Sequence, residues 1–385
     1  MEHVKNNIIK AAADRHQDIW DLAYRIGIHP EQGYLEYQAS HLLSSYLETR
    51  GFVIEHSLNG MATAFFARHK GKQPGPTIAF LAEYDALPDL GHACGHNLIG
   101  AASTGAAAVL SMIPEMPGEV CVIGTPAEET SGAKVTMIEN GTFQGLDAAL
   151  MFHPGNANVP EIGSLALDAI EVTYYGKSSH AALVNHNGIN ALEAVLNLFK
   201  KVKRLKYWLA KDERIDGIII EGGKSPNIIP DKAVARFYLR SGRREDLEIL
   251  RQRFINAAQK AADEEGARLD VCFYEHSYHE MVTNKPLAHT FANNLRTLGV
   301  TDIESPQSIL GSIDMGNVSH VVPALHAYLK MGEGKDIQHT SEFAKAAVSE
   351  PGEKVLLLAV QALALTGWDV LTDRRLLEQI KKDFF

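Results

Sequence analysis

The sequence predicts an α/β protein with two domains, a catalytic domain built on a doubly wound mixed sheet and an inserted ferredoxin-like βαββαβ domain. At 385 residues the chain is longer than one ordinary hydrophobic core supports. Short apolar runs alternate with amphipathic stretches, and polar residues gather where those runs end, which is typical of doubly wound sheets. We expect residues 1–166 and 283–385 in the first domain and residues 167–282 in the insertion.

Composition narrows the range of partners. Apolar residues make up 45% and charged residues 22%, as in soluble globular proteins. The formal charge of -10 argues against nucleic acid and membrane partners, which attract basic faces, and favours small-molecule substrates. Three cysteines are too few for a disulfide framework. With no signal-type apolar core near the N-terminus and no run of membrane-spanning length, we expect a cytoplasmic protein.

Hydrophobic periodicity places the elements of the first domain. The expected order is helix 4–26, helix 39–50, strand 77–82, helix 98–113, strand 119–124, helix 133–140 and strand 147–152. After the insertion we expect helix 286–298, strand 324–330 and a final helix 355–365 that ends at Gly367.

The middle of the chain reads as a split βαβ unit. Its expected elements are strand 168–176, helix 188–210, strand 217–221, strand 232–240, helix 245–264 and strand 268–275. In the strand at 232–240, Ala233, Ala235, Phe237 and Leu239 alternate with Arg236, Tyr238 and Arg240. One face of that strand therefore packs on helices, and the other faces water or a partner.

The stretch 81–100, LAEYDALPDLGHACGHNLIG, has the composition of a metal site. His92, Cys94 and His96 follow a buried strand and precede a helix, so they fall at the sheet edge where ligands bind. A lone cysteine is usually a core residue and a lone histidine a hydrogen-bonded one, but their spacing here favours metal ligation.

Two further strand ends carry polar chemistry at the same predicted edge. Glu128 and Glu129 follow strand 119–124, and His153 follows strand 147–152. Adjacent carboxylates point apart, so one can bind a metal while the other faces a metal-bound water. The alternatives are a solvated acidic pair and a structural histidine, and His339 reads equally well as an ordinary residue at the start of a helix.

The whole chain resembles peptidase family M20, the metal-dependent peptidases and amidohydrolases, and within it the subfamily lettered D. The resemblance is carried in order by EYDALP, GHACGHN, GTPAEET, FHP, GKSSHAA, PNIIPD and IQHTSEF, between about residues 80 and 345. It is closest to the aminobenzoyl-glutamate hydrolase and β-alanyl-lysine dipeptidase type. Two departures are Asn97, where most of the subfamily has aspartate, and Glu83, where the wider family has histidine.

The resemblance implies two divalent ions per chain. The implied ligands are Cys94, His96, Glu129, His153 and His339, with the Cys94 thiolate bridging. It further implies that Glu128 is the general acid/base and that Asp85 orients a metal-binding histidine. Paired ions lower the pKa of a shared water and polarise the amide carbonyl. Thiolate and imidazole suit Zn, and the carboxylates also admit Mn, Co or Ni.

The resemblance also assigns roles to the insertion, as a lid and dimerisation domain. It implies that Asn227 and Arg240 clamp the substrate carboxylate and that His180 stabilises the oxyanion in the site of a neighbouring subunit. The plainer interpretations are that Asn227 forms a turn, that Arg240 is a charge on the sheet face and that His180 is a loop histidine.

We therefore expect a homodimer or higher homo-oligomer that hydrolyses the amide bond of a dipeptide or N-acyl amino acid with a free carboxylate, as a dipeptidase, aminoacylase or carboxypeptidase. Glu128 would serve the metal-bridging water as general acid/base. Two alternatives are a catalytically silent ligand-binding or scaffold relative, and a thiol hydrolase that uses Cys94 as nucleophile.

Overall fold

The chain forms two compact units, each described here by itself. The computed structural model describes residues 2–182, 187–308, 311–335 and 337–384. The first unit comprises residues 1–163, 281–309 and 317–385, and the second comprises residues 164–280 and 310–316. The second unit therefore includes the short segment before Asn317, which was expected in the catalytic domain.

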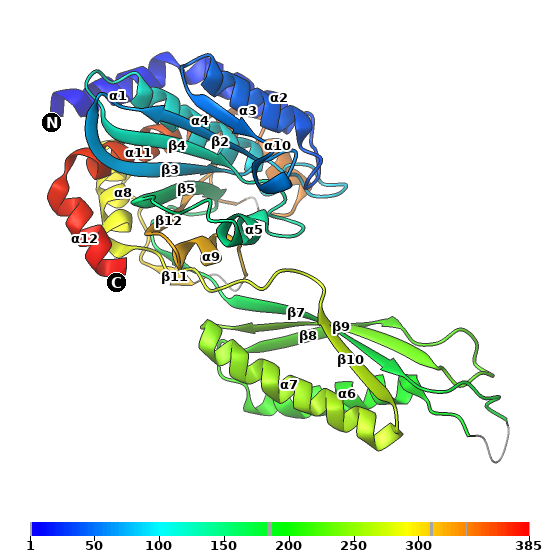
Figure 1. The fold of residues 1–385 in the computed structure, drawn as a ribbon. Helices are drawn as coiled ribbons and strands as arrows, with labels where there is room; N and C mark the ends of the chain where they lie inside the picture. The colour runs from blue at the N-terminus through cyan, green and yellow to red at the C-terminus, as the bar shows by residue number, and fades with distance from the viewer. Residues whose placement is uncertain (1, 183–186, 309–310, 336, 385) are drawn as a thin grey trace. The chain divides into compact units, whose positions relative to one another are not determined.

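The first unit is built on a six-stranded mixed sheet (Figure 1). Its strand order is β1 (Val53–His56), β2 (Phe65–Lys70), β4 (Pro117–Gly124), β3 (Gln73–Ala82), β5 (Ala148–Gly155) and β12 (Ala324–Lys330). β3 runs parallel to both β4 and β5, and β12 runs parallel to β5. Ala82 lies opposite Gly124, so the loops that leave β3 and β4 start side by side. The predicted α/β class with a mixed sheet is confirmed.

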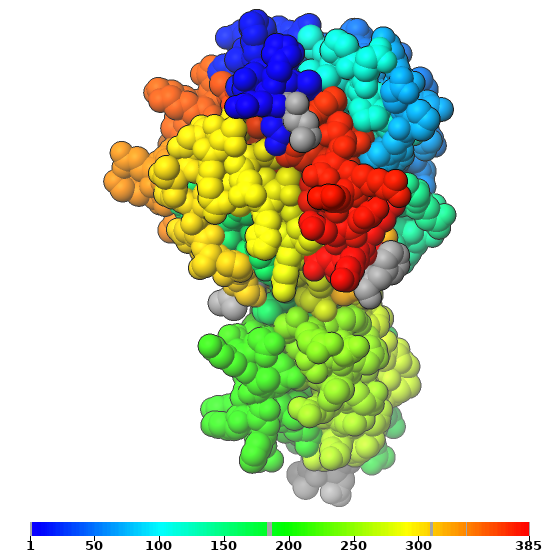
Figure 2. Space-filling view, turned by 90° about the vertical axis from the view of Figure 1, so that its left-hand side faces the viewer, coloured from blue at the N-terminus to red at the C-terminus, as the bar shows by residue number. Residues whose placement is uncertain are grey.

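Helices pack around this sheet. They are α1 (Glu2–Asp14), α2 (His16–Gly27), α3 (Tyr37–Glu48), α4 (His96–Ser111), α5 (Ala133–Glu139), α8 (Lys285–Thr297), α9 (Met315–Ser319), α10 (Ser341–Ala346), α11 (Glu350–Thr372) and α12 (Arg374–Phe384). α4 is rich in small and apolar residues, and is buried from His96 to Leu110 between β3 and α11. α12 lies against α8 on the surface (Figure 2), where the Asn284 side chain donates to the Ile380 carbonyl. Short pieces complete the unit: η1 (Leu58–Gly60) and the pair β6 (Ile162–Gly163) and β11 (Gln307–Ser308).

Three expectations for the helices were wrong. The helix expected over 4–26 is interrupted at Arg15, and α12 was not foreseen. Gly367 does not end the last long helix, because α11 continues to Thr372. A Cβ at Gly367 would lie 2.9 Å from both Ile78 Cδ1 and Phe80 Cζ, so glycine serves there for close packing on β3.

α11 is also long and apolar enough to span a membrane by length and composition, contrary to the expectation that no such run exists. However, 72% of its most apolar window is buried inside the unit. α11 is therefore a core helix of this fold.

The second unit has the ferredoxin-like order. Its antiparallel sheet runs β10 (Arg268–Phe273), β7 (Ala166–Tyr175), β9 (Lys232–Ser241) and β8 (Arg214–Glu221). α6 (Ala191–Leu205), α7 (Arg244–Glu265) and the short η2 (Lys206–Trp208) complete it. Ala233, Ala235, Phe237 and Leu239 of β9 join the core with both long helices, as the alternation predicted, while Arg236, Tyr238 and Arg240 are only partly buried on the opposite face. β8 forms one edge of this sheet.

Candidate metal centre

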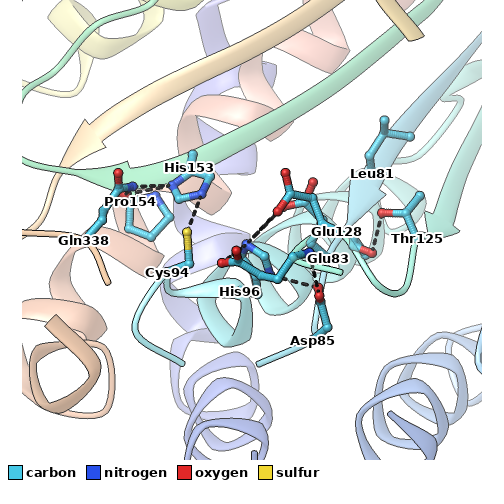
Figure 3. Close-up of polar contacts among 12 residues, drawn as sticks. Leu81, Glu83, Asp85, Cys94, His96, Thr125, Glu128, His153, Pro154 and Gln338 are labelled. Atoms are coloured by element: carbon cyan, nitrogen blue, oxygen red, sulfur yellow. Dashed lines mark hydrogen bonds and ion pairs between the residues drawn. The ribbon is translucent and has the colours of Figure 1, made fainter. Parts of the chain in front are cut away.

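The candidate site lies at the carboxyl ends of β3, β4 and β5 in the first unit (Figure 3). The loop after β3 carries Cys94 and leads into α4, whose first residue is His96. Gly95 adopts a left-handed conformation (φ +79), and a Cβ there would lie 2.4 Å from Pro154 Cγ. Glycine at this turn therefore lets Cys94 and His96 approach the end of β5, which carries His153.

The structure brings all five predicted ligands together. Cys94 Sγ lies 3.5 Å from Nε2 of both His153 and His339. Glu129 Oε1 lies 3.9 Å from His96 Nε2 and 3.7 Å from His339 Nε2. Three overlapping groups have donor atoms within 4.8 Å of one another, and Cys94, His96 and Glu129 each belong to two of them. The groups are Cys94, His96 and His153; Cys94, Glu129 and His339; and His96, Glu128 and Glu129.

Hydrogen bonds to the far ring nitrogens orient two imidazoles. His96 Nδ1 lies 2.9 Å from Asp85 Oδ1, and His153 Nδ1 donates to the Pro154 carbonyl at 2.8 Å. Each bond leaves Nε2 directed at the cluster, which is how proteins fix the tautomer of a metal-binding histidine. Asp85 thus lies where the sequence placed it, beside His96.

The electrostatics of the site fit cations. Burial raises the pKa of the Cys94 thiol, so a thiolate there needs a positive charge nearby. Burial, with His326 and His96 nearby, lowers the pKa of His153 to about 3, which keeps that ring neutral as a ligand must be. Among the described residues, the buried atoms His96 Nε2 and Glu129 Oε1 have no hydrogen-bond partner. Divalent ions would supply the missing partners, so these residues fit a metal.

Two buried carboxylates hold the turn that presents Glu128, and one of them was not foreseen from the sequence. Glu36 accepts from the backbone N–H of Ala127 at 2.8 Å and from the Thr63 hydroxyl at 2.8 Å. Asp85 Oδ2 accepts from the N–H of Glu129 at 2.9 Å. Ala127 has a left-handed backbone (φ +57), which is strained for alanine. The two carboxylates therefore fix the turn on both sides of Glu128.

Sequence reasoning gave no signal for Glu36. It lies one residue before α3 in a stretch that reads as a surface turn, yet its side chain is fully buried. Burial is the main cause that raises the pKa of Glu36 to about 7, against the hydrogen bonds that lower it.

The other predicted functional residues belong to the second unit. His180 is exposed and forms an isolated bridge with Ile228. Asn227 lies beside it, because the N–H of Ala181 donates to the Asn227 carbonyl at 3.0 Å. The contacts of both residues with substrate stay predictions.

Within one chain Arg240 and Asn227 lie at opposite ends of β9, so their predicted clamp on a substrate carboxylate stays a prediction that needs residues of two chains. Asn227 precedes β9 and Arg240 lies near its far end, roughly 25 Å away at the rise of an extended strand. Within one chain, one carboxylate cannot reach both. Arg240 instead lies over the Tyr238 ring, 4.9 Å from its centroid, and 4.0 Å from Asp216 Oδ2.

Comparison with known proteins agrees with this geometry. The model of peptidase family M20/M25/M40 matches residues 79–362. The Xaa-Arg dipeptidase of Mus musculus is 36% identical, with 98% of this chain and 90% of that protein covered. A p-aminobenzoyl-glutamate hydrolase polypeptide of Escherichia coli is 30% identical over 77% of this chain and 65% of its own.

Two solved structures share the fold. The YXEP protein of Bacillus subtilis, a dinuclear metal-binding peptidase from the M20 family, has a TM-score of 0.71 at 20% identity and covers 93% of this chain and 100% of its own. The aminobenzoyl-glutamate utilization protein of Klebsiella pneumoniae has a TM-score of 0.74 at 18% identity and covers 94% and 97%.

The fold and its buried donor cluster define a metal-dependent peptidase. The chain belongs to peptidase family M20/M25/M40, which confirms the family predicted from the sequence motifs.

The two buried cysteines of the first unit allow a matched test of metal ligation. We expect Cys94→Ser to lose at least one ion per chain, because serine lacks the readily ionised sulfur. Cys121→Ser, in the middle of β4, should keep the full metal content. Elemental analysis of the two purified variants decides, and equal metal content in both would contradict a bridging thiolate.

The raised pKa of Glu36 predicts a pH-dependent stability difference. Between the ordinary value of 4.5 and about 7, the folded state binds a proton that the unfolded chain has released. This contribution to the free energy of unfolding therefore falls as pH rises through that window. Glu36→Gln, which does not titrate, should gain stability relative to the wild type between about pH 5 and pH 8 in urea denaturation. A difference that stays constant across this range would contradict the assignment.

Proposed function

We propose that this protein is a binuclear metal-dependent dipeptidase that cleaves dipeptides with a basic C-terminal residue. The convergence of five ligand side chains and Glu128 in one cluster carries the proposal. The substrate class is supported by the similarity to the Xaa-Arg dipeptidases of mouse and human, which extends over 98% of the chain. An N-acyl amino acid with a free carboxylate is the broader class.

Five residues of the first unit would hold the ions. Cys94 would bridge, since it is the residue shared by the donor group that contains His153 and the donor group that contains His339. The remaining ligands would be His96, Glu129, His153 and His339. Thiolate and imidazole make Zn the first choice, with Mn second and Co or Ni as alternatives.

Glu128 would move the proton. Bound ions would polarise the amide carbonyl and acidify the attacking water. Glu128 would take the proton of that water as its oxygen bonds to the carbonyl carbon, and then deliver it to the amide nitrogen as the C–N bond breaks. Glu129 suits ligation better, because its Oε1 faces both His96 and His339, whereas Glu128 Oε2 lies 4.0 Å from His96 Nε2.

We further propose that the protein is a homodimer that pairs through the second unit. β8 is an edge strand, and three consecutive isoleucines on it are 62%, 42% and 49% exposed. Beside it, a hollow of about 630 Å³ between α6 and β8 is lined by Leu196, Phe199 and Phe237. A long apolar edge strand exposed to water attracts a second strand, and a second copy would cover both features.

A substrate panel tests the proposed function. The metal-reconstituted protein should hydrolyse dipeptides that end in Arg or Lys with a higher kcat/KM than aminobenzoyl-glutamate or N-acetyl-cysteine. Chelation should abolish the activity, and a divalent ion should restore it. A preference for aminobenzoyl-glutamate would contradict the substrate class, and activity that survives complete metal removal would contradict the mechanism.

Variants of the two adjacent glutamates should distinguish a catalytic role from a metal-binding role. Glu128→Ala should retain both ions but lose about a hundredfold or more in turnover, because general acid/base catalysis supplies a factor of that size. Glu129→Ala should lose metal as well. Metal content and turnover are measured on the same samples. A folded but metal-free Glu128→Ala protein would reverse the two assignments.

His180 should act across the dimer. His180→Ala should keep both ions and the fold but lose most turnover, about a hundredfold, because it removes a donor to the developing oxyanion. Mixing it with Glu128→Ala should restore part of the activity, since some heterodimers then carry one intact composite site. The assay follows proven subunit exchange. A mixture as inactive as both parents would show that His180 does not complete a neighbour's site.

A further inference from the structure

Beside the five ligands lies a buried ion pair that the mechanism above does not use. Glu83 follows β3 and Lys134 lies in the first turn of α5, and both side chains are almost completely buried. Lys134 Nζ lies 2.6 Å from Glu83 Oε1. Neither residue was assigned a role from the sequence.

The second oxygen of Glu83 faces the metal-binding nitrogen of His96. Glu83 Oε2 lies 3.5 Å from His96 Nε2, closer than Glu129 Oε1 at 3.9 Å or Glu128 Oε2 at 4.0 Å. Asp85 already occupies the other nitrogen of that ring. Three carboxylates therefore surround His96 Nε2, an atom without a hydrogen-bond partner among the described residues (Figure 3 shows Glu83 and Glu128 beside His96).

A purely structural ion pair accounts poorly for this arrangement. A lysine needs only one carboxylate oxygen, and a buried pair adds little stability over apolar residues of the same size. The pair also places a further carboxylate beside others that repel it. Such crowding is favourable only around cations.

We propose that Glu83 is a sixth metal ligand on the His96 side of the centre and that Lys134 is its positioning residue. Lys134 holds Oε1, while Oε2 faces Nε2 of His96, where the ion would bind. The inference rests on the proposed function, because it requires the metal centre.

The charges of the site agree with this role. The acidic groups around the centre are Glu83, Asp85, Cys94, Glu128 and Glu129. As anions they carry one negative charge more than two divalent ions neutralise, and Lys134 supplies the balancing positive charge.

Three variants separate a ligand from a structural pair: Glu83→Gln, Lys134→Met and the double variant. Melting temperature reports the fold, and calorimetric titration of the apo-proteins with Zn²⁺ and Mn²⁺ reports each ion's affinity. We expect Glu83→Gln to weaken one of the two ions about tenfold or more. Lys134→Met should lower the melting temperature, because it leaves a buried carboxylate unpaired in the apo-protein.

The double variant decides. It should recover the melting temperature, because no unpaired charge remains, while the affinity of that ion stays low. If it recovers both, or if Glu83→Gln binds both ions as the wild type does, the pair is structural and the inference fails. Should Glu83→Gln not fold, the double variant and Glu83→Asp, which keeps the charge but shortens the reach to His96, carry the same comparison.

A second Lys–carboxylate pair gives the control. Lys5 Nζ lies 2.7 Å from Asp369 Oδ2 in the same unit, away from the donor cluster. Lys5→Met combined with Asp369→Asn should leave both ion affinities unchanged. A wild-type protein that binds fewer than two ions would instead count against the proposed function itself.

Discussion

Repulsion among buried acidic groups is the constraint on which the rest of this site depends. Glu83, Asp85 and Glu129 lie with Cys94 at the carboxyl ends of β3, β4 and β5, where little water screens their charges. Moving such groups out of water is expensive unless positive charge compensates for it. Lys134 contributes positive charge, but the atoms His96 Nε2 and Glu129 Oε1 remain without hydrogen-bond partners among the described residues. The fold therefore leaves uncompensated negative charge at this site, and bound cations would compensate it.

Hydrogen bonds around the cluster fix the positions of the ligand side chains. Asp85 contacts the His96 ring with one oxygen and the N–H of Glu129 with the other, so a single side chain couples a ligand on α4 to the turn after β4. Glu36, one residue before α3, holds the same turn. Ala127, the residue before Glu128, has a left-handed backbone, and the hydrogen bonds from Glu36 and Asp85 hold it in that strained conformation. Both supporting carboxylates lie next to regular elements, Glu36 just before α3 and Asp85 in the loop after β3.

Much of this could be predicted, and the failures have physical causes. Apolar strands followed by polar loops located Cys94, Glu129 and His153 at one sheet edge, because parallel strands bring their carboxyl ends together. Glu36 and Lys134 escaped notice because their partners are far along the chain, and isolated charges read as surface residues. Gly367 was taken for a helix end because local sequence does not reveal that α11 packs closely on β3.

The most direct test of the binuclear centre is anomalous diffraction from crystals of the zinc-loaded protein. We expect two peaks per chain, about 3.5 to 4 Å apart, with the sulfur of Cys94 between them and Glu129 and the three histidines around them. A single peak, or two peaks that do not share Cys94, would contradict the binuclear centre on which the proposed function depends.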